Sequence, residues 1–275
     1  MALSIHTNYS SLVTNTALNK SNNALATNQQ RLGTGFRINS AADDAAGLQI
    51  ATRLNAQSRG MAVAMRNTGD AISMLQTAEG AFNELTDITQ RMKDLATQAA
   101  NDTNSDKDRT SIGAELTALQ LEFTNIVTNT TYAGEKILGT AGFGAGAVSF
   151  QIGATEAETY AFNASTHVAA VKLDAAPDVS DAAKAGASIT ALNNLLDTIG
   201  TARAAFGAGI NRLNHTNNNL ANMRDNTEMA KGRIMDADFA LESANMSKNS
   251  MLMQSGISML KQAGQMPGMV MGLLG

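Results

Sequence analysis

The chain has 275 residues, a net charge of -4 at pH 7 and a pI near 5.4, and it lacks the clustered Lys and Arg that nucleic-acid binding requires. Hydrophobic residues make up 44% of the chain but aromatic residues only 4%, with 15 Met and no Trp, which favours helices packed through small and flexible side chains. The absence of Cys excludes disulfides and thiolate chemistry, and no run of about 18 to 20 apolar residues is present to span a membrane.

The first expected helix precedes residue 35 and is nearly uncharged. Leu18, Leu25 and Leu32 recur every seven residues, the spacing of a coiled-coil seam. Asn and Thr fill the positions where a solvated coiled coil carries Glu and Lys, so we expect this helix to need neighbours on several sides. A frayed polar terminus is the alternative for an isolated chain. The segment has neither the basic part nor the apolar core of a signal peptide, and general secretion is therefore not expected.

A break between helices lies in the stretch 31–53, RLGTGFRINSAADDAAGLQIATR. Gly33 and Gly35 weaken the first helix. Asn39 or Ser40 is expected to cap the next helix, with Asp43 and Asp44 in its first turn. The run LGTGFRINSAADDAAGLQIA resembles the amino-terminal signature of bacterial flagellins. This resemblance implies a subunit of a helical filament.

A single long helix is expected from Asp44 to about Ala100. It would run about 80 Å at ~1.5 Å per residue, which predicts an elongated rod. Its apolar stripe keeps heptad spacing through Leu54, Met61, Leu75, Phe82, Leu85, Ile88, Met92, Leu95 and Ala99.

The polar run 101–109 predicts a turn, after which the chain doubles back. Asp102, Asn104 and Asp106 are similar to the start of a calcium-binding loop. Lys107 replaces the glycine of that loop and Gly113 replaces its bidentate Glu, so no calcium site is expected. The buried stripe of the following helix consists of Ile112, Leu116, Leu119, Phe123 and Ile126.

The resemblance also implies a surface for an immune receptor on these two helices. In flagellins of the enteric type, matching positions contact the innate immune flagellin receptor. Judged from the residues alone, the same positions form an exposed polar face with one leucine at the edge of the core. They are Gln90, Arg91, Leu95, Gln98 and Glu115.

Strand-like alternation replaces the helical pattern between Tyr132 and Asp174. The runs AVSFQIG and TYAFNA predict one or two β-hairpins. GFGAGAV is similar to a dinucleotide fingerprint, but Ala147 occupies its third glycine position and no strand–turn–helix unit surrounds it. In long flagellins, large variable outer domains are inserted here, so the resemblance implies a short form without them.

The return helix has the clearest periodicity in the chain. Its core positions are Leu192, Ile199, Phe206, Leu213 and Leu220, with Ile189, Leu196 and Ile210 in a companion row. The following run NRLNHTNNNLANMRDNTEMAKGRIMDADFALESA resembles the carboxy-terminal flagellin signature. His215 stands alone there, and Asp236 and Asp238 are interpreted as acids at a helix start rather than a catalytic pair.

The last helix carries heptad rows of Phe239, Met246, Met253 and Leu260, and of Leu252, Met259 and Met266. Like the first helix it has few charges, so we expect the two ends to pair with each other and with other subunits, and to be disordered before assembly. The residues predicted to form the filament core are Leu18, Leu25, Leu32, Phe239, Met246, Met253 and Leu260.

The predicted fold is mainly α, an elongated rod of long antiparallel helices with coiled-coil-like packing plus a small β-hairpin region. Three parts are expected: the terminal helices 1–42 and 235–275 pairing as a filament-core domain, a helical rod of 43–132 and 180–234, and a β-hairpin region 133–179. No catalytic, cofactor or metal site is expected, because His6, His167 and His215 lie in different segments and no HExxH or GxxxxGK motif occurs.

The predicted function is that of a structural subunit that polymerises into the bacterial flagellar filament. The alternatives are a hook–filament junction protein or other minor flagellar rod protein, and a non-flagellar coiled-coil adaptor. By resemblance, the expected partners are further copies of the chain, an export chaperone, the filament cap protein, the junction protein and the host flagellin receptor. Export through the flagellar secretion channel to the extracellular filament is likewise implied.

Overall fold

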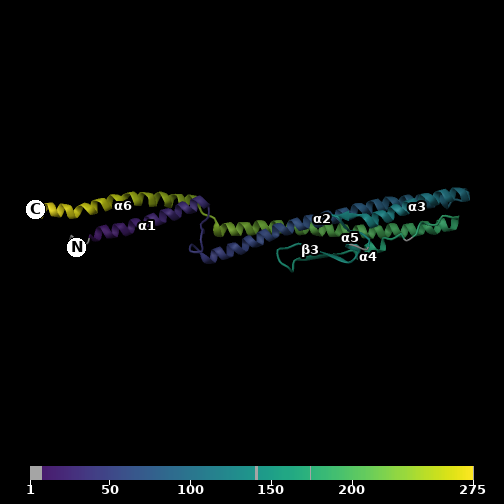
Figure 1. Cartoon of the computed structure of the whole chain (residues 1–275), viewed down its shortest axis with the longest axis horizontal. Coiled ribbons are helices and arrows are strands. Elements are labelled where there is room, and N and C mark those ends of the chain that lie inside the picture. Colours follow the sequence, from purple (N-terminus) through teal and green to yellow (C-terminus); the bar gives the residue numbers. More distant parts are fainter. Residues whose placement is uncertain (1–7, 140–141, 174, 275) are drawn as a thin grey trace. The chain divides into compact units, whose positions relative to one another are not determined.

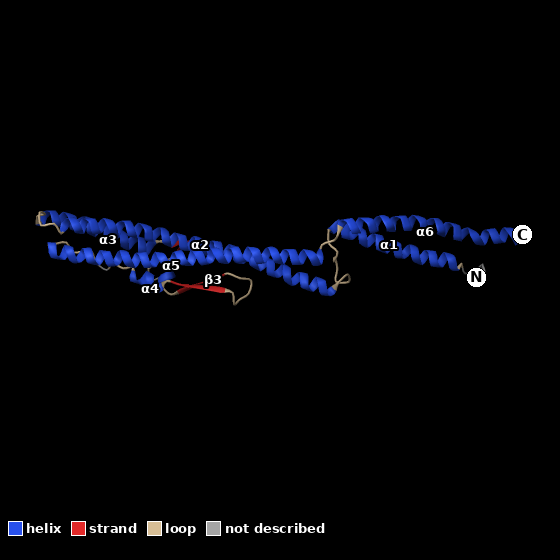
Figure 2. Ribbon diagram, turned by 180° about the vertical axis from the view of Figure 1, so that it is seen from behind, coloured by secondary structure: helices blue, strands red, loops and turns tan. Residues whose placement is uncertain are grey.

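The computed structural model describes residues 8–139, 142–173 and 175–274. Long helices dominate it, and two short antiparallel hairpins lie between the third and fifth helices (Figures 1 and 2). The elements in chain order are α1 (Tyr9–Thr34), α2 (Ala45–Ala99), α3 (Asp106–Asn129), β1 (Thr131–Tyr132), β2 (Glu135–Lys136), the 3-10 turn η1 (Gly142–Gly144), β3 (Ala147–Gln151), β4 (Thr159–Asn163), α4 (Ser165–Ala170), α5 (Ala182–Met235) and α6 (Phe239–Leu274).

The chain divides into two compact units. The terminal unit comprises the residues up to 56 and those from 226 onward, and the central unit comprises Gln57–Asp225. The terminal unit therefore contains α1, α6, the start of α2 and the end of α5. Helices of 55 and 54 residues, α2 and α5, confirm the mainly α prediction. In the part of the chain that the structure describes, no helix is long and apolar enough to cross a membrane.

The core of the central unit is built by α2, α3 and α5, which lie side by side (Figure 2). The predicted stripe of α5 is confirmed, since its five heptad residues from Leu192 to Leu220 are all buried. The stripe of α3 is likewise buried or half-buried. Phe206 lies at the centre of an aromatic cluster, with its ring centroid 5.3 Å from Phe82, 5.0 Å from Phe143 and 5.1 Å from Phe162.

The hairpin of β3 and β4 confirms the strand prediction for AVSFQIG and TYAFNA. Its register pairs Ala147 with Asn163 and Gln151 with Thr159. Tyr160 and Phe162 of β4 are buried and alternate with exposed neighbours, as expected for a strand with one face on a core. The ring of Phe162 packs against α5, where the Arg212 guanidinium lies 4.3 Å from the centroid of the Tyr160 ring.

Candidate functional site

In the terminal unit, α1 and α6 pair along their lengths in antiparallel directions (Figure 1). At one end of the pair, Arg31 lies 3.1 Å from Glu242. At the other end, Asn8 Nδ2 donates a hydrogen bond of 2.7 Å to the carbonyl oxygen of Ala263. Both helices are thus formed in the single chain, and the expected disorder of the isolated subunit stays a prediction.

The ends of α1 are set by local hydrogen bonds. The Asn8 side chain caps the first turn by accepting from the Ser11 amide at 3.1 Å. Gly35 ends the helix in the left-handed region, with φ of 74°, and its N–H donates to the Arg31 carbonyl. A short antiparallel bridge follows: the Arg37 amide donates to Met235 O at 2.6 Å, and the Ala237 amide donates to Gly35 O at 2.9 Å.

The seam between α1 and α6 has two kinds of position. Six of the seven residues predicted for the filament core are half-buried in it, whereas Phe239 is 57% exposed. Leu18, Leu25 and Leu32 come from α1, and Met246, Met253 and Leu260 come from α6. The second row of seam positions is Thr14, Ser21 and Asn28 on α1, and Glu242, Asn249, Gly256 and Ala263 on α6, while Ser11 extends the leucine row by one heptad.

The second heptad row expected on α6 does not take part in the seam with α1. Leu252 and Met259 are 48% and 59% exposed, while Met266 lies outside the described side chains. Small and polar residues of α6, namely Asn249, Gly256 and Ala263, face α1 instead. At Gly256, for example, a Cβ atom would come within 3.2 Å of Leu18 Cδ1. A search for apolar periodicity does not detect such a row.

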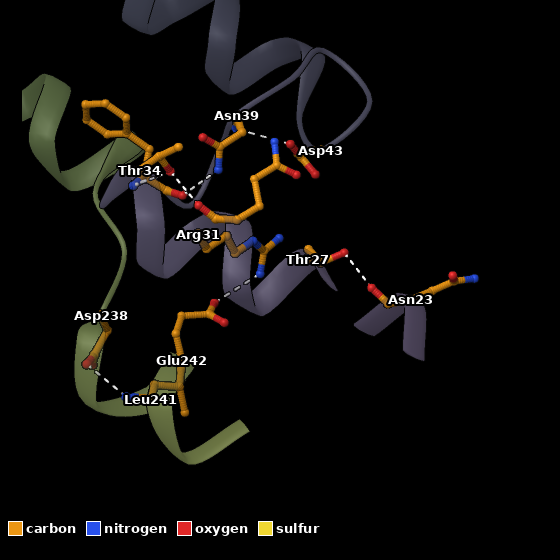
Figure 3. A network of polar contacts seen from close by, with 11 residues as sticks. Asn23, Thr27, Arg31, Thr34, Asn39, Asp43, Asp238, Leu241 and Glu242 are labelled. Atoms are coloured by element: carbon orange, nitrogen blue, oxygen red, sulfur yellow. Dashed lines mark hydrogen bonds and ion pairs between the residues drawn. The ribbon is translucent and has the colours of Figure 1, made fainter. Parts of the chain in front are cut away.

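Buried polar side chains lie at the end of the seam where α1 finishes and α6 begins, and Figure 3 shows Arg31 facing Glu242 there. Asn28 and Glu242 are each 7% exposed. Arg31 Nη1 donates to Glu242 Oε1 at 3.1 Å. With its amide nitrogen turned toward the acceptors, Asn28 donates to Glu242 Oε2 and accepts from Asn249 Nδ2, each at 3.2 Å. We call Asn28, Arg31, Glu242 and Asn249 the polar cluster.

The start of α2 differs from the prediction. Asn39 and Ser40 do not cap this helix; it begins at Ala45, and the Asp44 side chain accepts from the Gly47 amide at 2.8 Å. Asp43 instead closes the preceding turn by accepting from the amides of Asn39 and Ser40 (Figure 3). The hydrogen bonds from Ser40 and Asn39 lower the pKa of the Asp43 carboxyl.

Asp238 precedes α6 and caps its first turn, because its side chain accepts hydrogen bonds from the amides of Ala240 at 2.9 Å and Leu241 at 3.1 Å. The expectation of an acid at a helix start is thus confirmed for Asp238. Asp236 has a different place: it lies just after α5, its amide donates to Gly232 O, and it pairs with Phe36 in the bridge.

Large apolar side chains are exposed on both helices of the pair. Such exposure over neighbouring residues is unusual for a monomer and indicates a contact surface. Charged residues within the two helices are few, namely Lys20, Arg31, Glu242, Lys248 and Lys261. The exposed apolar residues are Tyr9, Leu12 and Val13 on α1, and Phe239, Leu241, Met251, Leu252, Ile257 and Met259 on α6.

The residues expected to contact an immune receptor lie in the central unit. Gln90, Arg91, Gln98 and Glu115 are exposed. Arg91 links α2 to α3 through hydrogen bonds of 3.1 Å from Nε and 2.7 Å from Nη2 to Glu115 Oε1. Leu95 is only 3% exposed, so it packs beneath this surface.

Within the described ranges, no group of three His, Cys, Asp or Glu side chains is placed to hold a metal ion. His167 lies in α4 and His215 in α5, and His6 lies outside the described residues. The run GFGAGAV forms η1 and enters β3 instead of opening a helix, so it lacks the geometry of a dinucleotide site.

Two family models match this chain. Residues 5–142 match the bacterial flagellin N-terminal helical region, and residues 189–274 match the bacterial flagellin C-terminal helical region. The unmatched segment between them contains β3, β4 and α4.

Curated relatives match along their whole length. Flagellin A of Vibrio anguillarum is 34% identical, and polar flagellin B/D of Vibrio parahaemolyticus is 35% identical, each over 382 aligned positions that cover 100% of both chains. Because 382 positions exceed the 275 residues of this chain, the relatives contain internal residues that it lacks. The crystal structure of Bacillus cereus flagellin has 32% sequence identity, covers 56% of this chain and 88% of that chain, and gives a TM-score of 0.48.

Proposed function

Since this chain belongs to the bacterial flagellins and is a subunit of the flagellar filament, we propose that its α1–α6 pair forms the contacts of the filament core. As a flagellin it is a structural protein and not an enzyme. The relatives match along the whole chain, which favours a filament subunit over a junction protein or a coiled-coil adaptor.

One observation carries the proposal: α1 and α6 expose apolar side chains on faces that their mutual seam does not use. Leu252 and Met259 of α6 lie on one such face, and Tyr9, Leu12 and Val13 gather near the start of α1. Burying a Leu or Met side chain contributes ~1.5 to 3 kcal/mol when it is fully removed from water. Other copies of the subunit carry the same exposed apolar faces and can cover these side chains.

A filament follows from contacts of this kind when they are heterologous. A face of α6 that meets a different face on the next subunit leaves the first face of that neighbour free, so addition continues. Contacts that do not close into a ring generate an open helix. This is the physical reason for assigning polymerisation to the terminal unit.

We assign three roles along the chain on the same grounds. Residues 1–42 with 235–275 form the filament-core domain, and 43–132 with 180–234 form a separate helical domain. The hairpin region 133–179 takes the place of the outer domains of longer flagellins. The extra internal residues of the Vibrio relatives support this last assignment.

Family membership also supports finer proposals about partners. We propose export of the subunit through the flagellar secretion channel, handling of α6 by an export chaperone, addition beneath a cap protein, and attachment of the first subunits to a junction protein. In a cell from which the flagellar secretion channel has been deleted, the subunit should stay inside the cell and be purified with the chaperone bound to α6. Release of the subunit into the medium by that cell would contradict the export route.

Thiol footprinting tests the core assignment directly, because the chain has no Cys of its own. Leu252→Cys and Met259→Cys should react readily with a maleimide in the soluble subunit and become protected at least about tenfold in the filament. Glu156→Cys, on the exposed loop between β3 and β4, is the matched control and should react equally in both states. Equal reactivity of all three positions in the filament would refute the assignment.

The exposed pair of Arg91 and Glu115 favours a second role, as a ligand of the host flagellin receptor. The two side chains are 57% and 46% exposed, and Gln90 and Gln98 lie on the same helix as Arg91. Arg is favoured at the centres of protein interfaces because it combines charge with several donors. Leu95 supports this surface from beneath.

A further inference from the structure

The apolar row of the α1–α6 seam does not define how the two helices are aligned. Leu18, Leu25 and Leu32 repeat every seven residues, and so do Met246, Met253 and Leu260. A slide of α6 by one heptad therefore places Leu again opposite Met or Leu. Coiled coils with such repeating seams need another feature to select one register.

The second row of the seam does not repeat. Along α6 it reads Glu242, Asn249, Gly256 and Ala263, and along α1 it reads Thr14, Ser21 and Asn28. A slide of one heptad in one direction puts Asn249 opposite Arg31 and Ala263 opposite Leu18. The opposite slide puts Asn249 opposite Leu18 and removes any acid from Arg31.

Each of these slides costs a specific contact. In the observed register, the Glu242 carboxylate accepts hydrogen bonds from Arg31 at 3.1 Å and from the Asn28 amide at 3.2 Å. The Asn249 amide donates a hydrogen bond to Asn28 at 3.2 Å. A slide leaves the buried Glu242 or Asn28 without a partner, and an unpaired buried polar group is strongly unfavourable. The close approach of Leu18 to Gly256 fits the same register, since a Cβ atom at position 256 would lie only 3.2 Å from Leu18 Cδ1.

We propose that the polar cluster of Asn28, Arg31, Glu242 and Asn249 selects a single register between α1 and α6, and thereby fixes which exposed apolar faces the subunit presents to its neighbours. This inference rests on the proposed function, because the register matters where α1 and α6 contact further subunits. If leucines replaced the cluster residues, the seam would be more stable but could adopt several registers. Polar groups give up some stability for one alignment.

The backbone bridge near Gly35 is the competing explanation. It joins Arg37 to Met235 and Ala237 to Gly35 through main-chain atoms, so it holds the adjoining ends of α1 and α6 close together. Main-chain hydrogen bonds do not depend on side-chain identity. Replacing the cluster side chains while leaving the bridge intact therefore separates the two explanations.

Engineered cysteine pairs report the register, because the chain has no native Cys. Leu18→Cys with Gly256→Cys reports the observed register, in which these side chains meet. Leu18→Cys with Ala263→Cys reports a slide in one direction, and Ser11→Cys with Gly256→Cys reports a slide in the other. Intramolecular disulfide is scored on gels, in the soluble subunit and in pelleted filaments, after mild oxidation.

The variant that tests the proposal carries Asn28→Leu, Glu242→Leu and Asn249→Leu. Its slipped pairs should cross-link at least about fivefold more than those of the unmodified cluster. The control carries Thr14→Leu and Ser21→Leu, which also make the second row of the seam more apolar but spare the cluster, and it should keep the observed register. If the cluster variant cross-links only in the observed register, contacts other than the cluster set the alignment and the proposal is wrong.

Charge reversal gives a second test that does not depend on added leucines. Arg31→Glu should raise slipped cross-linking, and Arg31→Glu combined with Glu242→Arg should restore the observed register. Slipped products equal in the single and double variants would also overturn the proposal. Assembly is scored separately: a subunit locked in the observed register that fails to polymerise would refute the proposed function and leave the register inference standing.

Discussion

Replacing Leu252 of α6 by Asp should prevent assembly while leaving the subunit folded. Leu252 is 48% exposed in the single chain, so about half of its side chain is available to a neighbour. Full burial of Leu contributes ~1.5 to 3 kcal/mol, which gives ~1 kcal/mol for the exposed part. Placing a carboxylate in the same contact adds a desolvation cost of several kcal/mol.

Together these effects amount to ~3 kcal/mol or more for each subunit added. Since ~1.4 kcal/mol corresponds to a factor of ten, the concentration of subunit left unpolymerised at equilibrium should rise about 100-fold or more. Sedimentation after seeding measures this concentration in the supernatant. Circular dichroism should show the helix content of the unmodified subunit.

Leu121→Asp provides the matched control. Leu121 of α3 is 64% exposed, so its replacement by Asp in the folded subunit has little effect on stability, and assembly should change by no more than about twofold. Normal assembly of Leu252→Asp would refute the argument that the exposed face of α6 is a contact. An equal loss with Leu121→Asp would place an essential interface on the central unit.

Three further predictions address the rest of the chain. Phe206→Ala removes a buried ring worth ~3 to 5 kcal/mol, so it should lower the thermal midpoint of unfolding, measured by calorimetry, by about 6 to 20 °C. Phe239→Ala changes an exposed ring and should alter the midpoint little. Similar shifts for the two variants would contradict the core assignment. Arg91→Ala should weaken receptor signalling about tenfold or more, taking ~1.4 kcal/mol for one lost anchor, and the exposed Arg59→Ala should not; unchanged signalling by folded Arg91→Ala would refute the receptor surface. Trypsin should cleave after the exposed Lys20 and Lys248 at least about tenfold faster in the soluble subunit than in the filament, because the seam between α1 and α6 is weak before assembly. Equal cleavage rates in the two states would refute the expected disorder of the termini.

The central unit was predictable because its pattern is strong. Leu192, Ile199 and Phe206 repeat at heptad spacing with no polar interruption, and all are buried. The strands AVSFQIG and TYAFNA alternate in a way that a helix does not. In these segments local preference, periodicity and burial agree.

The terminal unit was predictable only in part. Leu18, Leu25 and Leu32 indicated the apolar row of the seam, but its other row includes Glu242 and Asn249, which a search for hydrophobic periodicity passes over. Polar residues enter a seam when a specific partner lies opposite, and α1 and α6 are more than 200 residues apart in the sequence. One signal was present: small and polar residues, such as Thr14, Ser21 and Asn28, recur at the same heptad spacing as the leucines.

The start of α2 and the depth of Leu95 show two other limits. Asn39 and Ser40 were the expected caps, but Asp43 and Asp44 differ little from them in capping preference, and the turn closed by Asp43 leaves Asp44 at the helix start. Leu95 falls at the edge of a periodic stripe, where a rotation of the helix by a few degrees separates a buried side chain from an exposed one. Both were set by tertiary packing.

Removal of residues 253–275 tests the central claim most directly, that the paired termini assemble the filament. The deletion takes away Met253, Gly256 and Leu260 from the seam, and also the exposed Met259, while the core of the central unit loses none of its contacts. The truncated chain should unfold cooperatively by circular dichroism and should give no sedimenting polymer after seeding. Filaments of normal diameter formed by the truncated chain would contradict the account and place the assembly interface on the central unit.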